Sequence, residues 1–524
     1  MKKIFTLLVG IVFWVNGFSQ VTFVKRYGGW YEGTAYSVKQ TSDGGYIILS
    51  YTELFGAGQD DIFLIKTDYK GDTLWTKTFG GDGWERGYSV QQTADGGYFI
   101  TGLTSSFGAV SIDIYIIKTD GNGTLVWSKT FNGTSLNYTT ASGRQTNDGG
   151  YIIVGNTDNF GTGGYDVYLI RIDASGNLLW AKTYGGPSEE AGECVEETSD
   201  HGFIITGYSS SYGAGDIDIY LLRTDSSGNF IFSKTCGGTG TDFGKSVVQT
   251  TDGGYIICGY TNSFGAGSED ICLIKTDNNG DVIWTKTYGT AGADQGYSVI
   301  QNNNGGYVVT GLTYGVATTG TDLYLVNVND TGAILWNRTY SFGNSTDAGY
   351  CVQQTNDGGY IVSGTGLLSP FVSALILIKT DSIGRSGCAE VIYVNTVNTH
   401  IIQSVNHVPA ISSGSGGTTP TTITGGGGGA VFTYCTSVGV NEINAEENTI
   451  SLFPNPATNE IEIKESGIRI DAVEIYDVLG RRCLTPALSK GEGVRVDVSS
   501  LSAGIYFVKV RSEKAERVMK FVKE

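Results

Sequence analysis

The chain has 524 residues, more than one hydrophobic core usually organises, so two or three domains are expected. Its 78 glycines against 7 prolines, together with 31 tyrosines and 22 phenylalanines, favour tight turns between aromatic-rich strands over long helices. The net charge of -18 disfavours nucleic acid as a partner, because a phosphate backbone is bound by clustered Lys and Arg.

The first 19 residues have the pattern of a secretory signal peptide. Two lysines precede an apolar run over residues 4–15, and the small residues Gly17 and Ser19 occupy the positions that a signal peptidase reads. We expect cleavage before Gln20. The apolar run is shorter than the roughly 20 residues of a membrane-spanning helix, and no later stretch is longer, so no transmembrane anchor is predicted.

A repeated unit of 52 or 53 residues follows. The segment DGGY, or a close variant, occurs seven times, beginning at residues 43, 95, 148, 200, 252, 304 and 357. Each copy contains four β-branched or aromatic stretches (A to D) separated by Asp- and Gly-rich turns, which predicts four strands. Seven such units predict an all-β fold, a seven-bladed β-propeller over residues 20–385.

The two ends of the repeat region set its phase. The seventh copy ends at Asp381 without a strand D, and residues 21–29 (VTFVKRYGG) match that missing strand, with Phe23 and Lys25 in the Trp and Lys positions of WTKTYGG. We therefore expect the N-terminal strand to complete the seventh blade, which leaves no open edge at either end. In this phase the varied D–A and B–C loops share one face, where we expect the function.

Candidate ligand-binding residues lie on this variable loop face. They are acidic residues just before strand A and aromatic residues of the loops: Trp30, Tyr31, Trp84, Glu85, Phe107, Glu190, Asp242, Asp294 and Asp347. A second acidic column begins strand C, at Asp61, Asp113, Asp166, Asp218, Asp270 and Asp322. Such carboxylates could hold Ca²⁺ or act in pairs on a sugar. Alternatively, each carboxylate fixes the loop of its own blade by accepting backbone N–H bonds, as its repetition favours.

Histidine chemistry has little support, because the chain has only three histidines, at 201, 400 and 407. No catalytic residue, metal site or cofactor is predicted beyond the possible Ca²⁺. The eight cysteines show no C-x-x-C spacing, although Cys258 and Cys272 could pair, as could Cys388 and Cys435.

Two further columns predict contacts between blades. The Trp and Tyr columns favour inter-blade packing. The strand-A amides predict a hydrogen-bonded ring near the axis, formed by Gln40, Gln92, Gln145, Gln249, Gln301 and Gln354, with Glu197 in the fourth blade.

After the repeats, the amino-acid composition and pattern of the chain change twice. Residues 386–448, with SSGSGGTTPTTITGGGGG, are predicted to be a flexible linker. A compact β pattern over residues 449–524 predicts a small Ig-like β-sandwich. Three runs within it, FPNPATN (453–459), YDVLGR (476–481) and LSAGIYFVKV (501–510), resemble in their order the type A C-terminal sorting domain of the type IX secretion system. The residues that carry this resemblance are Phe453, Pro454, Asn455, Pro456, Tyr476, Asp477, Gly480, Arg481, Gly504 and Tyr506.

The resemblance implies contact with the type IX secretion machinery, export across the outer membrane of a Bacteroidetes-type cell, removal of the domain, and release or attachment to surface lipopolysaccharide. Two functions then fit the sequence. One is a secreted or cell-surface binding or adhesion protein that recognises a glycan or protein through its loops. The other is a secreted carboxylate-dependent polysaccharide hydrolase or lyase. The first is favoured, because the sequence shows no histidine base, metal-ligand cluster or asymmetric acid pair.

Overall fold

The computed structural model describes most of the repeat region and parts of the C-terminal region. The described residues are 20–27, 33–54, 56–108, 112–134, 141–314, 320–342, 346–369, 372–387, 390–391, 396–400, 405–407, 410–413, 431–437, 450–453, 459–465, 470–477, 482–484, 493–502, 504–512 and 516–523. The regular elements in these ranges are all strands, and no helix there could cross a membrane. The predicted signal peptide lies outside the described residues.

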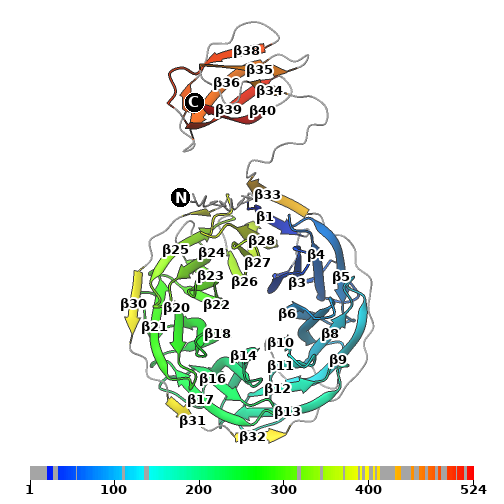
Figure 1. Cartoon of the computed structure of the whole chain (residues 1–524). Helices are drawn as coiled ribbons and strands as arrows, with labels where there is room; N and C mark the ends of the chain where they lie inside the picture. The colour runs from blue at the N-terminus through cyan, green and yellow to red at the C-terminus, as the bar shows by residue number, and fades with distance from the viewer. Residues whose placement is uncertain are drawn as a thin grey trace, which may run out of the picture. The chain divides into compact units, whose positions relative to one another are not determined.

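The repeat region forms seven antiparallel sheets, which we call blades 1 to 7. Figure 1 shows them around a central opening. Blades 1 to 3 are β2 (Ser37–Gln40), β3 (Tyr46–Thr52), β4 (Asp61–Thr67) and β5 (Thr73–Phe79); β6 (Glu85–Gln92), β7 (Tyr98–Thr104), β8 (Ile112–Thr119) and β9 (Leu125–Thr134); and β10 (Ser142–Gln145), β11 (Tyr151–Thr157), β12 (Asp166–Ile172) and β13 (Leu178–Gly185). Blades 4 and 5 are β14 (Glu190–Glu197), β15 (Phe203–Ser209), β16 (Asp218–Thr224) and β17 (Phe230–Cys236); and β18 (Asp242–Gln249), β19 (Tyr255–Thr261), β20 (Asp270–Thr276) and β21 (Val282–Gly289). Blades 6 and 7 are β22 (Asp294–Gln301), β23 (Tyr307–Tyr314), β24 (Thr321–Val328) and β25 (Ile334–Tyr340); and β26 (Ala348–Gln354), β27 (Tyr360–Ser369), β28 (Val372–Thr380) and β1 (Thr22–Tyr27).

The N-terminal strand β1 is the fourth strand of blade 7. It pairs antiparallel with β28, and Phe23 lies opposite Lys379 just as Trp75 lies opposite Lys66 in blade 1. The ring of Phe23 packs against Tyr46 of blade 1 at 6.1 Å. The predicted pairing and phase are confirmed.

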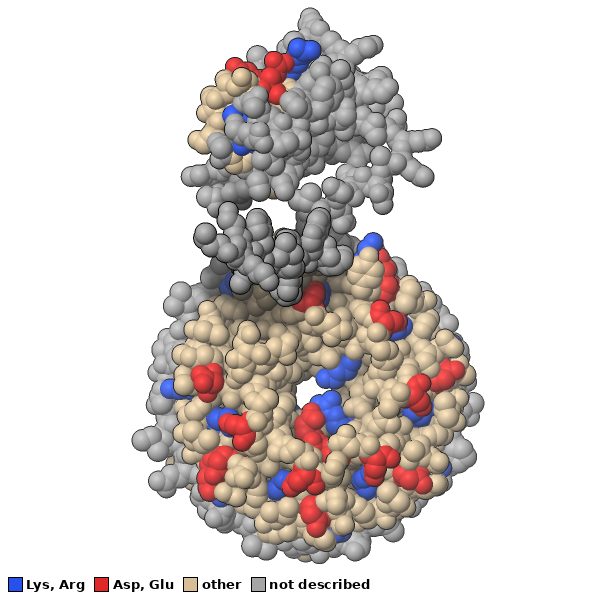
Figure 2. All heavy atoms as spheres, viewed as in Figure 1, with Lys and Arg blue, Asp and Glu red and all other residues tan. Residues whose placement is uncertain are grey.

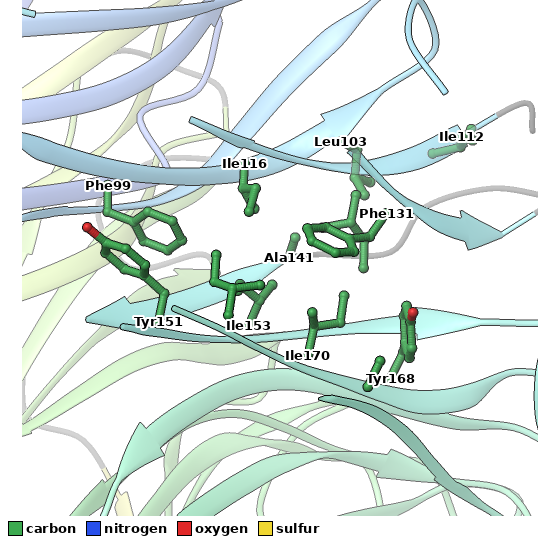
Figure 3. Close-up of a cluster of buried hydrophobic side chains, with 13 residues drawn as sticks. Phe99, Leu103, Ile112, Ile116, Phe131, Ala141, Tyr151, Ile153, Tyr168 and Ile170 are labelled. Carbon is green, nitrogen blue, oxygen red and sulfur yellow. The ribbon is translucent and has the colours of Figure 1, made fainter. Parts of the chain in front are cut away.

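The middle strands of each blade are buried on both faces, because neighbouring sheets pack against them. Their sequences are accordingly nearly continuous apolar runs, such as IDIYIIKT in β8. Figure 3 shows one of the cores between blades, where Phe99 and Ile116 of blade 2 meet Tyr151 and Ile153 of blade 3. The Trp and Tyr columns meet across the same boundaries, as in Trp75–Tyr98 at 5.8 Å, which confirms inter-blade packing.

The predicted amide ring also connects the blades. The side chain that ends each strand A accepts an N–H from the A–B turn of the neighbouring blade, over 2.7 to 2.9 Å. The acceptor–donor pairs are Gln92–Ser42, Gln145–Ala94, Glu197–Asn147, Gln249–Ser199, Gln301–Thr251, Gln354–Asn303 and Gln40–Asn356. The last bond joins blade 7 to blade 1 in the same way as the other six join consecutive blades.

The segment predicted as a linker contains five short strands at the outer edges of blades. β29 (Glu390–Val391), β30 (Thr396–His400), β31 (Val405–His407) and β32 (Ala410–Ser413) pair with the D strands of blades 6, 5, 4 and 3, and β33 (Val431–Ser437) pairs with β1. The composition did not predict these strands, because pairing at an open sheet edge uses backbone groups and requires little of the side chains. Within the described ranges, blades 1 and 2 receive no added strand.

The chain divides into two compact units, residues 1–439 and 440–524. The second has two sheets: β34 (Ile450–Phe453), β35 (Glu460–Glu465) and β38 (Gly493–Asp497); and β37 (Arg482–Leu484), β36 (Ile470–Asp477), β39 (Gly504–Ser512) and β40 (Glu516–Lys523). Apolar residues of both sheets, including Ile463, Val473 and Val508, share one core. The Ig-like topology stays a prediction.

Two cysteines that were expected as a possible pair are free thiols. Cys258 and Cys272 lie on neighbouring strands, but Cys258 is opposite Leu273 and Cys272 is opposite Gly259. The two side chains belong to different cores on the two sides of blade 5, so they do not form a bridge.

Candidate functional site

The D–A and B–C loops lie side by side on one face, as the phase predicted. The amide of Glu85 donates to the Asp60 carbonyl (2.6 Å), and that of Gln59 donates to the Gly83 carbonyl (2.8 Å). On the other side, the amide of Ser105 donates to the Trp84 carbonyl (2.9 Å). This D–A loop, between β5 and β6, is therefore held between the B–C loops of blades 1 and 2.

The carboxylates of this face point into the loops. In blade 2, Glu85 accepts the amide of Gly81 (2.7 Å) and the hydroxyl of Thr104 (2.6 Å), while Asp61 of blade 1 accepts the amide of Ala57 (3.1 Å). The members of the predicted ligand set Glu85, Glu190, Asp242, Asp294 and Asp347 are at most 1 % exposed. This burial supports the interpretation that they fix the loops.

The two acidic columns meet in pairs. A Cβ atom at Gly185 would overlap Asp166 and lie 3.0 Å from Glu190 Oε2, so both carboxyl groups converge on this glycine. A larger residue is disfavoured here, because its Cβ would overlap the Asp166 carboxylate and crowd that of Glu190. Burial, with a further contribution from the charge of Glu190, raises the pKa of Asp166 from 3.8 to about 7.

The aromatic candidates divide into three cases. Trp84 packs against the Arg86 guanidinium (5.7 Å), which also lies over Tyr51 (4.8 Å) and forms an ion pair with Asp60. Phe107 packs on Tyr115 at 5.7 Å and acts as a loop-packing residue. Trp30 and Tyr31 lie outside the described residues.

A feature that the sequence interpretation missed is a cavity of about 520 Å³ lined by the A strands. Tyr297, Tyr350, Tyr36 and Tyr88, from blades 6, 7, 1 and 2, form a chain of rings with successive centroid separations of 5.1, 5.3 and 5.0 Å. Burial raises the pKa of each above 10.0, so their hydroxyls stay protonated.

Ion pairs line another part of the same cavity. Lys245 of blade 5 binds Glu193 of blade 4 (2.9 Å), and Arg144 of blade 3 binds Glu196 of blade 4. Burial is the largest single influence on Lys245 and lowers its pKa, but the charge of Glu193, the neighbouring Tyr260 and the hydrogen bond to Glu193 together outweigh burial and raise the pKa, so Lys245 stays protonated. The signal in the sequence was the variation at these strand-A positions, where a purely structural column would repeat one residue type.

Within the described ranges, no group of three or more His, Cys, Asp or Glu side chains is placed to hold a metal ion. His201, exposed in its turn with φ of 64°, contacts Glu197 through Nδ1 (3.0 Å). The Asp–x–x–Gly turns are hairpins in which the Asp accepts loop amides, as Asp68 accepts those of Lys70 and Asp72.

The motif residues of the C-terminal unit are partly described. Tyr476 donates to Glu474 (2.8 Å), Tyr506 donates to the Ser502 carbonyl (3.0 Å), and Asp477 lies opposite Tyr506 in the sheet. Phe453 ends β34 and Gly504 begins β39. Pro454, Asn455, Pro456, Gly480 and Arg481 lie outside the described residues.

Among solved structures, the chain is similar to a mutant puromycin hydrolase in complex with PGG (12 % identity, TM-score 0.37), and it spans 52 % of that protein with 64 % of its own length. It is also similar to a eukaryotic initiation factor (9 % identity, TM-score 0.31, 74 % and 98 % of the two chains) and to an endo-1,5-alpha-L-arabinanase from Thermotoga petrophila (12 % identity, TM-score 0.23, 66 % and 82 %). No curated protein matches the chain.

A family model gives the decisive comparison for the second unit. The model of the secretion system C-terminal sorting domain matches residues 451–524, which contain all three runs of the resemblance. Residues 451–524 are therefore a type IX sorting domain, and this tail marks the protein for secretion and export to the cell surface.

Proposed function

We propose that the protein is a secreted or cell-surface binding protein whose seven blades form a closed β-propeller with a ligand site. The pairing of β1 with β28 in blade 7 and the hydrogen bond between Gln40 and Asn356 support closure of the propeller. The two sheets that share a core support an Ig-like sandwich for the sorting domain. A signal peptide over residues 1–19 supplies passage across the inner membrane.

The observation that carries this proposal is the cavity lined by the A strands. Its volume of about 520 Å³ is within the range of small-molecule and glycan sites. Tyrosine rings provide a rigid apolar surface with polar tips, and the charged and hydroxyl side chains provide orientation. Trp84 and Arg86 lie beside Tyr88 at a smaller hollow on the loop face, so a ligand could contact both.

One observation supports the alternative function, a carboxylate-dependent hydrolase or lyase. The pKa of Asp166, about 7, resembles that of a general acid. However, the Asp166 side chain is buried, and its Oδ2 accepts the Thr162 amide (2.9 Å), so a polysaccharide does not reach it without loop rearrangement. Binding is therefore the better-supported function.

The test uses the chain without its predicted signal peptide, residues 20–524, which we call the mature chain, on arrays of glycans and proteins. A second assay measures the release of reducing ends from polysaccharides. We expect binding without turnover. Replacing Tyr88 by Ala should weaken binding at least tenfold, whereas Tyr69→Ala, an exposed turn tyrosine (52 %), should leave it unchanged. Turnover that is lost in Asp166→Asn would instead establish the hydrolase.

A further inference from the structure

The side chains that line the cavity differ from blade to blade, and these differences indicate the class of ligand. Near the loop face, in blades 2 and 4 to 7, a β-bulge lies at one strand-A position, as at Gly87/Ser89 of β6. A bulge re-aims a side chain, and in blades 4 to 7 the residue at the bulge and the one three positions later both line the cavity. In blade 1, Tyr36 and Lys39 line the cavity with the same spacing. These five blades therefore contribute two levels of side chains.

In blades 7 and 1, the two levels combine aromatic and polar groups. Tyr350 and Tyr36 are in ring contact at 5.3 Å, and three residues further along their strands stand Gln353 and Lys39. A ligand extended along this wall would meet two neighbouring rings first and then an amide and an ammonium group.

Lys39 is the cation of the cavity that has no carboxylate partner among the described residues. Arg144 and Lys245 are neutralised by Glu196 and Glu193, so the lining carries three cations against two carboxylates. Figure 2 shows Lys and Arg side chains at the central opening. In a protein with a net charge of -18, this excess of positive charge favours an anionic group inside the cavity.

Hydroxyl groups complete the lining. Serines from five blades face the cavity: Ser37, Ser89, Ser142, Ser246 and Ser298. Several of them already accept an amide of the next blade, as Ser246 accepts that of Val299 (3.3 Å), which fixes the direction of the hydroxyl. Fixed hydroxyls, neutral phenols and amides match the many donors and acceptors of a sugar, while the ring faces match its C–H surface.

We propose that this cavity binds an acidic oligosaccharide, with sugar rings packed on Tyr36 and Tyr350 and a uronate carboxylate paired with Lys39. The proposal rests on the binding function and specifies its ligand class. A carboxylate without another partner near Lys39 forms a charge-assisted hydrogen bond, which is stronger than a neutral one.

The experiment measures binding of the mature chain to three uronate oligomers, of galacturonate, alginate and hyaluronan, with maltohexaose as the neutral probe. At least one uronate should bind more tightly than maltohexaose, and binding should weaken as salt is added. Lys39→Gln should weaken it at least tenfold, Lys39→Arg should largely restore it, and Lys70→Gln, which removes an exposed turn charge, should change it less than twofold. Tryptophan fluorescence melting confirms that each variant is folded.

The outcomes separate this proposal from the binding function. If none of the uronates binds, or if Lys39→Gln binds them as tightly as the unmodified chain, the proposal is overturned. In that case a neutral glycan, peptide or protein captured on the arrays keeps the binding function and changes its ligand. If the mature chain binds nothing on the arrays and none of the uronates, both the binding function and its acidic ligand are refuted.

Discussion

Asp166 and Glu190 give the sharpest test of how the loop face is held together. Burial, and then the charge of Glu190, raises the pKa of Asp166 from 3.8 to about 7 in the folded protein. A group with a raised folded pKa contributes stability that is fully present below its unfolded pKa and is lost as pH rises through the folded pKa. The free energy of unfolding therefore falls between about pH 4 and about pH 7. The total decrease is at most about 4 kcal/mol, at 1.36 kcal/mol per pKa unit.

Replacing Asp166 by Asn should abolish this loss. An amide retains an acceptor for the Thr162 N–H and stays uncharged beside Glu190 at every pH, as the protonated carboxyl of Asp166 is at low pH. The free energy of unfolding is measured in urea from pH 4 to pH 8 by tryptophan fluorescence. All tryptophans precede residue 440, so the signal reports on the blades.

The variant should resemble the unmodified protein at pH 4 and exceed it by up to a few kcal/mol at pH 8. Asp82→Asn, an exposed loop carboxylate, serves as the control and should keep the original pH dependence. The reasoning is refuted if Asp166→Asn loses stability with pH as steeply as the unmodified protein.

Three further predictions follow from the contacts. Gly185→Ala should destabilise the blades by about 3 kcal/mol or more, because its Cβ overlaps Asp166, whereas Gly149→Ala, with open space and φ of +86°, should cost about 1–2 kcal/mol by urea unfolding. Gln354→Leu should cost about 0.5–1.5 kcal/mol in the same assay, because it removes the hydrogen bond from the Asn303 amide; an unchanged free energy of unfolding would contradict a structural amide ring. Deleting residues 451–524 should leave folded protein in the periplasm of a type IX-competent host, and normal amounts in the medium or on the surface would argue against the sorting role.

The sequence predicted most of the fold because the repeat presents each signal seven times. The strand order, the seat of β1 and the amide ring all followed from comparing equivalent positions. The edge strands β29 to β33 did not follow, because they are held by backbone pairing and leave no hydrophobic period in the sequence.

The site was predicted less well than the fold. Glu85 and its equivalents were correctly placed next to the loops, but sequence alone cannot say whether a repeated carboxylate points outward or, as here, inward. The cavity was missed because its lining depends on a bulge that turns Tyr88 toward the axis, and a one-residue irregularity does not alter the repeat pattern.

The position of β1 constrains the order in which the molecule assembles. Its partners β28 and β33 are synthesised several hundred residues after it, and closing a loop of that length costs about 5 kcal/mol of chain entropy. The hairpins of the earlier blades can form in order of synthesis, but the seventh sheet must wait until both ends of the repeat region are free. Until then, apolar side chains such as Tyr46 and Ile361 lack their neighbours. Removing the few residues of β1 would therefore leave the facing edges of β28 and β33 without their partner, and unpaired strand edges promote aggregation.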